Sequence, residues 1–246
     1  MKYSSLVKNI LNKESKRIFF RLGDKCLTKL YERKYHSSAE VLKKSPVIWL
    51  RTPKTASSSI KIILNSQDRV FDWTANPSVP LTSDDLERKI ICVAASAKRK
   101  FSNQYPEIWE SAFKWVVVRN PFEKTLSAWN YVSGINEKPL LQLLETPPRL
   151  EEDKTAYTHF TLRQFDLLSD DGHIVVDKVI KYETIDSELG ALFELFGLEF
   201  RGLPKVNRTV SRRAYESLNF SEREAIRKLF QKDFAEFDYD LDTESN

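Results

Sequence analysis

Cysteine, histidine and glycine are scarce in this sequence of 246 residues, which contains two, three and six of them, respectively. Cys26 and Cys92 lie far apart, and Cys92 falls within an apolar run. The sequence therefore indicates no disulfide framework and favours a reducing compartment. The His and Cys residues form no cluster with metal-ligand spacing. We therefore predict that the protein binds no metal.

Long apolar runs are also missing. No stretch approaches the ~20 apolar residues that a membrane-spanning helix requires, and the first residues lack the apolar core of a signal peptide. These two features predict a cytoplasmic protein. Hydrophobic residues nevertheless make up 41% of the chain and charged residues 30%. This balance is ordinary for a globular protein with a substantial core.

The net charge of +4 is unevenly distributed along the chain. Residues 1–44 hold twelve Lys and Arg against four Asp and Glu, and the remaining residues hold 27 against 31. Apolar residues recur at helical spacing within the basic segment. We predict that residues 1–45 form a basic helical extension and residues 46–242 a single domain. The extension would either pack on the domain or contact an anionic membrane surface or acidic glycan. Because the positive charge is confined to the extension, nucleic-acid binding is not favoured.

Strand-like and helix-like segments alternate from residue 46 onward. Apolar runs predict strands at 47–50, 89–95 and 114–118 and within 173–182, where 179–182 is the better candidate for a buried strand. Helical spacing predicts helices at 58–65, 97–103, 107–112, 122–132, 137–145, 185–196 and 221–235. Residues 146–148 are expected to form a loop, which opens a charge-rich region over 147–157. This alternation predicts an α/β fold with a P-loop-like parallel sheet flanked by helices on both faces.

The polar segment after the first predicted strand is the most informative part of the chain. Residues 51–60 read RTPKTASSSI and lead into a helix whose first turn is rich in hydroxyl groups. Unpaired N–H groups at the helix start, the hydroxyls and the Lys54 ammonium can together bind a phosphate or sulfate. Alternatively, the serines only cap the helix and Lys54 is solvated. The segment has none of the glycines of a Walker A loop, which argues against a nucleoside triphosphate.

Residues 113–129 repeat this pattern of strand, polar turn and helix. Arg119 lies at the end of the strand, Pro121 at the expected helix start, and Ser127 about two turns along that helix. The planar fork of donors on arginine suits a phosphate monoester, and a hydroxyl can complete the site. Ligands of parallel sheets bind beyond the carboxyl ends of the strands. Two such segments therefore predict a ligand that is phosphorylated at two positions.

These segments resemble the two donor-binding motifs of sulfotransferases that use 3′-phosphoadenosine 5′-phosphosulfate. Residues 53–59, PKTASSS, resemble the 5′-phosphosulfate loop, and residues 118–129 resemble the 3′-phosphate motif. The similarity is greatest to carbohydrate O-sulfotransferases of the heparan sulfate 2-O-sulfotransferase type. It continues through shorter segments, so that it covers roughly residues 46–240: 159–165, 179–183, 203–208 and 233–239. The resemblance implies in-line transfer of a sulfuryl group to an acceptor hydroxyl, expected to be that of a carbohydrate.

The resemblance also implies roles for individual residues. Lys54 would face the transferred group and act in catalysis. The loop that holds the 5′-phosphate would comprise Lys54, Thr55, Ala56, Ser57, Ser58 and Ser59. Arg119 and Ser127 would hold the 3′-phosphate. Arg208 matches a loop that closes over the nucleotide, with Arg212 and Arg213 as alternatives, although arginines in such loops can equally be solvated.

The acceptor hydroxyl needs a base that takes its proton. Relatives often carry a His after the second strand, but the matching residues 94–97 read AASA. Ala94 indicates a different base, an inactive protein or a substitution introduced deliberately. His159 is the best remaining imidazole, although it could instead be structural or bind the acceptor. Weaker candidates are Asp68, Asp72 and Glu183.

Two other functions stay open at this point. One is a nucleotide- or glycan-binding protein that keeps the fold but has lost turnover, as Ala94 allows. The other is a small-molecule kinase with a degenerate phosphate loop, which would bind ATP with magnesium. The missing glycines and the Arg119 and Ser127 element argue against the kinase.

Overall fold

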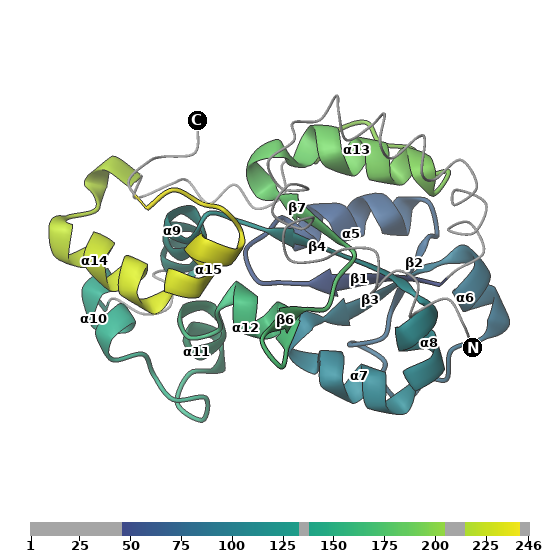
Figure 1. Ribbon diagram of the computed structural model, residues 1–246, viewed down its shortest axis with the longest axis horizontal. Coiled ribbons are helices and arrows are strands. Elements are labelled where there is room, and N and C mark those ends of the chain that lie inside the picture. The colour runs from purple at the N-terminus through teal and green to yellow at the C-terminus, as the bar shows by residue number, and fades with distance from the viewer. Residues whose placement is uncertain (1–45, 133–137, 205–214, 242–246) are drawn as a thin grey trace.

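The computed structural model describes residues 46–132, 138–204 and 215–241 (Figure 1). The basic extension predicted for residues 1–45 lies outside the described residues, as do Arg208, Arg212 and Arg213. Contact of the extension with a membrane surface therefore stays a prediction. In the described ranges, no helix is both long and apolar enough to span a bilayer.

A five-stranded parallel sheet in the order β2-β3-β1-β4-β7 forms the centre of the molecule. Its strands are β1 (Val47–Arg51), β2 (Val70–Asp72), β3 (Ile90–Ala94), β4 (Phe113–Val118) and β7 (Lys178–Lys181). Strands that are buried on both faces read as continuous apolar runs, and β1, β3 and β4 do so. The predicted α/β fold with a parallel sheet is confirmed. β2 was not predicted, because three partly buried residues give too short a pattern.

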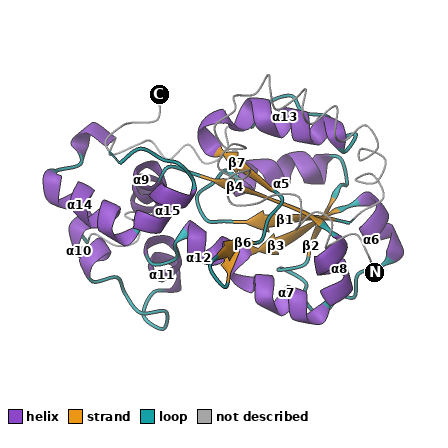
Figure 2. Ribbon diagram, in the orientation of Figure 1, coloured by secondary structure: helices purple, strands orange, loops and turns teal. Residues whose placement is uncertain are grey.

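Helices cover both faces of the sheet, as predicted (Figures 1 and 2). One face carries α5 (Ser57–Ser66) and α13 (Ile185–Leu195). The other carries α6 (Ser83–Arg88), α7 (Lys98–Gln104) and α8 (Pro106–Ser111). Successive residues of β1 point to opposite faces, so Trp49 packs in the first layer and Leu50 in the second.

A group of helices lies at one end of the sheet, on the left in Figure 1. It consists of α9 (Pro121–Val132), α10 (Leu140–Glu145), α11 (Lys154–Phe160), α14 (Phe220–Leu229) and α15 (Gln231–Glu236). These helices share a third hydrophobic cluster that contains Phe122, Phe160 and Phe230. The short helix α12 (Gln164–Leu168) connects this group to the sheet and is followed by a small antiparallel pair, β5 (Ser169–Asp170) and β6 (His173–Ile174).

One predicted helix has the wrong bounds. The single helix predicted over 221–235 is two helices, because Phe230 leaves the helical conformation with φ −109° and ψ 22°. Within the charge-rich region 147–157, α11 begins at Lys154 after an N-cap at Asp153, which accepts a hydrogen bond from the Ala156 N–H (2.9 Å). The run 173–182 contains two strands, β6 and β7, and β7 joins the central sheet, which agrees with 179–182 as the better candidate for a buried strand.

Candidate functional site

The chain passes from β1 into α5 at the centre of the sheet's carboxyl edge. β1 lies between β3 and β4, and the chain forms β2 and β3 on one side before it crosses to β4 on the other. Such a reversal of strand order is a topological switch point, where open parallel sheets bind their ligands. The fold therefore places residues 52–56 at the expected ligand-binding position.

This loop has an unusual backbone. Lys54 and Ala56 both adopt left-handed conformations, with φ 64° and 59°, which cost a non-glycine residue about 1–2 kcal/mol each. Buried hydrogen bonds hold the turn: the Thr52 hydroxyl donates to the Val117 carbonyl (2.6 Å), and the Thr55 hydroxyl donates to the Thr52 carbonyl (3.0 Å). Left-handed residues between ordinary ones turn consecutive N–H groups toward one concave surface, which suits an anion.

The serines lie in the first turn of α5 and do not cap it. Ala56 is the N-cap residue, and no described side chain accepts a capping hydrogen bond. The first N–H groups of a helix lack intrahelical partners and carry partial positive charge, so they are suited to bind an anion. Ser57 and Ser58 are accessible, whereas Ser59 is buried and donates to the Pro204 carbonyl (2.8 Å).

Arg119 follows β4 and contacts this loop directly. Its Nη1 donates to the Lys54 carbonyl (3.4 Å) and its Nη2 to Glu123 (3.1 Å), while the guanidinium lies 4.3 Å from the centroid of the Tyr182 ring. The buried Nε has no acceptor among the described residues. Ser127 lies partly buried on α9, the helix that begins two residues after Arg119. The structure thus joins the two sequence motifs at neighbouring strand ends.

Lys54 is a partly buried cation in this loop. Burial lowers its pKa to about 8, and the positive charge of Arg119 contributes to this decrease. Its Nζ lies 4.2 Å from the centroid of the Tyr131 ring, which the sequence did not single out. At pH 7 Lys54 still carries its charge, so the loop presents an ammonium beside the guanidinium of Arg119.

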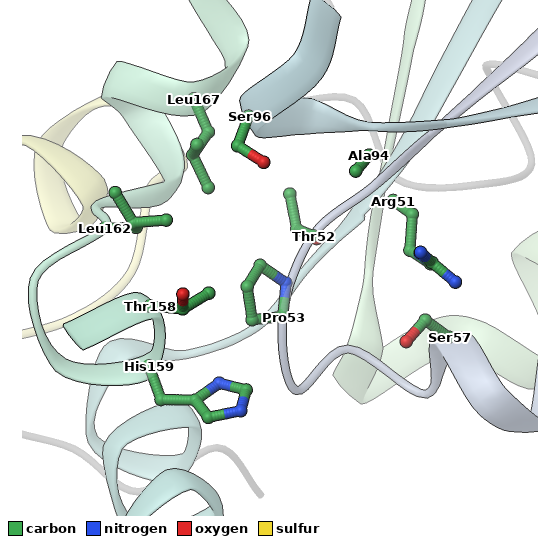
Figure 3. A pocket seen from close by; sticks show the side chains of 10 residues that line it. All are labelled: Arg51, Thr52, Pro53, Ser57, Ala94, Ser96, Thr158, His159, Leu162 and Leu167. Carbon is green, nitrogen blue, oxygen red and sulfur yellow. The ribbon is translucent and has the colours of Figure 1, made fainter. Parts of the chain in front are cut away.

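A cavity of about 220 Å³ lies beside the loop (Figure 3). Residues from the ends of β1 and β3 and from α11, α12 and nearby loops line it: Arg51, Thr52, Pro53, Ser57, Ala94, Ser96, Thr158, His159, Leu162 and Leu167. None of these residues is acidic. Ala94 and His159 lie on different sides of the cavity, with Thr52 and Pro53 between them (Figure 3). The cavity therefore has hydroxyl groups, one guanidinium and one imidazole on its wall.

His159 is a neutral imidazole in this environment. Burial lowers its pKa to about 4, and the charges of Lys54 and Lys124 add to this effect. Its ring packs edge-on against Tyr131, with the centroids 5.3 Å apart, and its buried Nδ1 has no partner among the described residues. A neutral imidazole on a cavity wall can accept a proton from a bound hydroxyl.

The three weaker candidate bases, Asp68, Asp72 and Glu183, lie in environments that differ from that of His159. Although burial raises the pKa of Asp72, hydrogen bonds from Lys61 and the Ala75 N–H, with the charge of Arg51, hold it below its ordinary value. Glu183 accepts hydrogen bonds from the Asn120 N–H (2.8 Å) and the Tyr239 hydroxyl (3.0 Å). Asp68 follows α5 and is exposed before β2 begins, at the opposite edge of the sheet. Among the residues that line the cavity, His159 alone carries an uncharged ring nitrogen that can accept a proton.

These features define an α/β protein with a candidate anion site at the switch point of its sheet. A family model described as the sulfotransferase family matches residues 38–240, and the chain belongs to this family. The family predicted from the two motifs is therefore confirmed. The narrower likeness to the heparan sulfate 2-O type stays a prediction.

The fold is also similar to the crystal structure of a sulfotransferase from Alicyclobacillus acidocaldarius. The TM-score is 0.51 and the identity 14%, over 78% of this chain and 94% of that chain. At this identity the similarity supports the fold alone. No protein with a curated description matches this chain in sequence. The described residues include no group of three or more His, Cys, Asp or Glu side chains arranged to hold a metal ion.

Proposed function

We propose that the protein transfers a sulfuryl group from 3′-phosphoadenosine 5′-phosphosulfate to an acceptor hydroxyl of a carbohydrate. The observation that carries this proposal is the contact between Arg119 and the Lys54 carbonyl (3.4 Å), which brings the two motifs together. The loop from Lys54 to Ser59 would bind the 5′-phosphosulfate. Arg119 and Ser127 would bind the 3′-phosphate, and Arg208 is proposed as a further contact to the nucleotide.

Three properties of the site support an anionic donor. The turn from β1 into α5 has two left-handed residues, and no described side chain caps α5. The buried Nε of Arg119 lacks an acceptor among the described residues. No acidic side chain lines the cavity. Backbone N–H groups, a helix N-terminus and a guanidinium are the groups that proteins use to bind phosphate and sulfate.

In the proposed reaction the acceptor oxygen forms a bond to sulfur as the bond between sulfur and the 5′-phosphate oxygen breaks. Lys54 stabilises the negative charge that develops on the leaving oxygen, as fixed cations do in phosphoryl transfer. His159 takes the proton of the acceptor hydroxyl. The products are the sulfated acceptor and 3′-phosphoadenosine 5′-phosphate. No metal takes part in this scheme.

The lining of the cavity supports a polyhydroxylated acceptor. Ser96 and Thr158 supply hydroxyl groups, and Arg51 supplies several N–H donors. Such groups can hydrogen-bond to the many hydroxyls of a sugar. Leu162 and Leu167 give the same cavity an apolar wall against which the face of a sugar ring can pack.

Calorimetric titration tests the donor. The protein is titrated with 3′-phosphoadenosine 5′-phosphate and with ATP, each with and without magnesium. We expect tight, magnesium-independent binding of the bisphosphate and much weaker binding of ATP. Magnesium-dependent preference for ATP would overturn the proposal and favour the small-molecule kinase.

Ala94 favours a second candidate, a nucleotide- or glycan-binding protein without turnover. Ala94 lines the cavity at the position where relatives often carry a His. Transfer of the sulfuryl group from the donor to a panel of carbohydrates is measured for the wild type, His159→Gln and Ala94→His. Turnover by the wild type that is lost in His159→Gln supports the enzyme. Donor binding without turnover, together with turnover in Ala94→His, supports the second candidate.

A further inference from the structure

The peptide of Arg119 is held by a side chain from outside the sheet. The Arg119 N–H donates to Gln164 Oε1 (2.8 Å), and Gln164 Nε2 donates back to the Arg119 carbonyl (2.8 Å). These two bonds imitate the pairing that a neighbouring strand would provide, at the point where β4 has ended. Gln164 is the first residue of α12 and is completely buried.

Gln164 is fixed in turn by Asp233 of α15. One carboxylate oxygen of Asp233 accepts from the Gln164 N–H (2.9 Å) and the other from the Phe165 N–H (2.7 Å). Asp233 thereby satisfies N–H groups in the first turn of α12, although it lies almost seventy residues further along the chain. Its side chain, like that of Gln164, is completely buried.

The next peptide is held in a similar way. The Asn120 N–H donates to Glu183 Oε1 (2.8 Å), and Asn120 Oδ1 accepts from the Phe122 N–H in the first turn of α9 (2.9 Å). Side chains from different elements therefore form hydrogen bonds with two consecutive peptides. The backbone from which the Arg119 side chain projects has little freedom to turn.

The burial of the Asp233 carboxylate and the Gln164 carboxamide needs a physical explanation. Apolar residues of the same size are often equally stabilising at such positions. Here the side-chain hydrogen bonds of Gln164 go to Arg119, the residue proposed to bind the 3′-phosphate, and Asp233 holds the helix turn that carries Gln164. A guanidinium recognises a phosphate through two parallel N–H donors, so its binding depends on a fixed orientation.

We propose that Gln164 is a positioning residue for Arg119 and that Asp233 holds it in place, so that α15 helps to set the affinity for the 3′-phosphate. This inference rests on the proposed function. It adds buried residues that do not touch the nucleotide to those that determine the selection of 3′-phosphorylated nucleotides.

The test compares the dissociation constants for 3′-phosphoadenosine 5′-phosphate and for adenosine 5′-phosphate. The Kd for adenosine 5′-phosphate divided by the Kd for 3′-phosphoadenosine 5′-phosphate gives a ratio that isolates the contribution of the 3′-phosphate. Hydrogen bonds to charged groups contribute enough for Arg119→Ala to lower this ratio by about 10- to 100-fold. Gln164→Met keeps the volume of the side chain but removes both hydrogen bonds. We expect it to lower the ratio by about tenfold, with at most a small change in the affinity for adenosine 5′-phosphate. The double variant should show no further loss, because both changes act through one guanidinium.

Gln67→Met is the matched control. Gln67 exchanges the same two hydrogen bonds with the peptide of Glu199 (2.8 and 2.9 Å). It lies at the far end of α5 from the loop. Its replacement should reduce thermal stability without changing the ratio. Gln164→Glu, which keeps the acceptor for the Arg119 N–H but loses the donor, should give a ratio between those of the wild type and Arg119→Ala.

The outcomes separate this inference from the proposed function. A wild type without preference for the 3′-phosphorylated nucleotide would overturn both. A wild-type preference that survives in Gln164→Met and Gln164→Glu, even with a lower melting temperature, would overturn the inference alone. A ratio that falls in these variants and stays constant in Gln67→Met would establish the positioning role.

Discussion

At the scale of single residues, Lys54 combines a left-handed backbone with a partly buried ammonium. We expect Lys54→Met to lower kcat by about 100- to 1,000-fold, because a fixed charge acts mainly on the leaving oxygen in the transition state. The affinity for 3′-phosphoadenosine 5′-phosphate should fall by about tenfold or less, because the N–H groups of the loop remain. Steady-state kinetics and calorimetry measure the two effects separately.

Lys178→Met provides the control for this prediction. Lys178 pairs with Glu188 (2.6 Å) at the start of β7, away from the carboxyl edge. Its loss should leave both kcat and nucleotide affinity close to the wild-type values. A loss of nucleotide affinity in Lys54→Met with kcat unchanged would show that Lys54 only binds the nucleotide.

The lowered pKa of Lys54 predicts a pH dependence of nucleotide binding. The charged form of Lys54 binds an anion, and this form is lost as the pH rises through about 8. Between pH 7.5 and 9.5, we expect the affinity for 3′-phosphoadenosine 5′-phosphate to fall by up to about tenfold in total, which is the limit expected for Lys54→Met. His159 contributes nothing in this range, because its pKa of about 4 leaves it neutral throughout.

Lys54→Arg tests the origin of this dependence, because arginine stays charged over the whole range. Binding to Lys54→Arg should be nearly constant with pH, as measured by calorimetry in buffers of equal ionic strength. A fall in affinity that persists in this variant would assign the titration to another group.

At the scale of elements, the turn between β1 and α5 is formed without glycine. Ala56 adopts φ 59° as the N-cap of α5. Glycine reaches this conformation without steric cost, so we expect Ala56→Gly to raise the free energy of unfolding by about 0.5–1 kcal/mol despite its greater freedom when unfolded. Chemical denaturation measures the change.

Ala225→Gly should change the free energy of unfolding in the opposite direction. Ala225 lies within α14, where the same substitution costs about 1 kcal/mol. Two identical substitutions with opposite effects would show that the backbone of Ala56 is strained. If Ala56→Gly destabilises the protein as much as Ala225→Gly does, the left-handed conformation of Ala56 is refuted.

At the scale of the whole molecule, the sequence predicted the sheet better than the helices around the site. β1, β3 and β4 are long apolar runs, and their burial on both faces makes this pattern unambiguous. β2 and α11 are short, and their patterns are weak. The sequence predicted α14 and α15 as a single helix, because an aromatic residue such as Phe230 does not mark a helix end in sequence.

The candidate site was predictable where it follows a strand and less so where it depends on packing. Lys54 and Arg119 follow apolar runs directly, so their common edge follows from the parallel sheet. Tyr131 lies beside Lys54 and His159 because α9 and α11 pack together, which no local pattern shows. The pairing of Gln164 with Asp233 joins segments about seventy residues apart and is likewise a property of the fold.

Because the site joins the sheet to the helical group through Arg119 and Gln164, a bound nucleotide should stabilise the whole molecule. At a hundredfold excess over Kd, 3′-phosphoadenosine 5′-phosphate should add about 2.7 kcal/mol. For a protein of this size, that raises Tm by roughly 5–10 °C. Scanning calorimetry or dye-based thermal melting measures the shift.

Adenosine 5′-phosphate at the same concentration should give a much smaller shift, because it lacks the group that Arg119 is proposed to bind. In Arg119→Ala the two nucleotides should give similar shifts, since the guanidinium that distinguishes them is gone. The Tm of the unliganded variant is recorded alongside, because Arg119 also bonds to Glu123 and its loss alters stability by itself. Equal shifts for both nucleotides in the wild type would contradict recognition of the 3′-phosphate by this edge of the sheet.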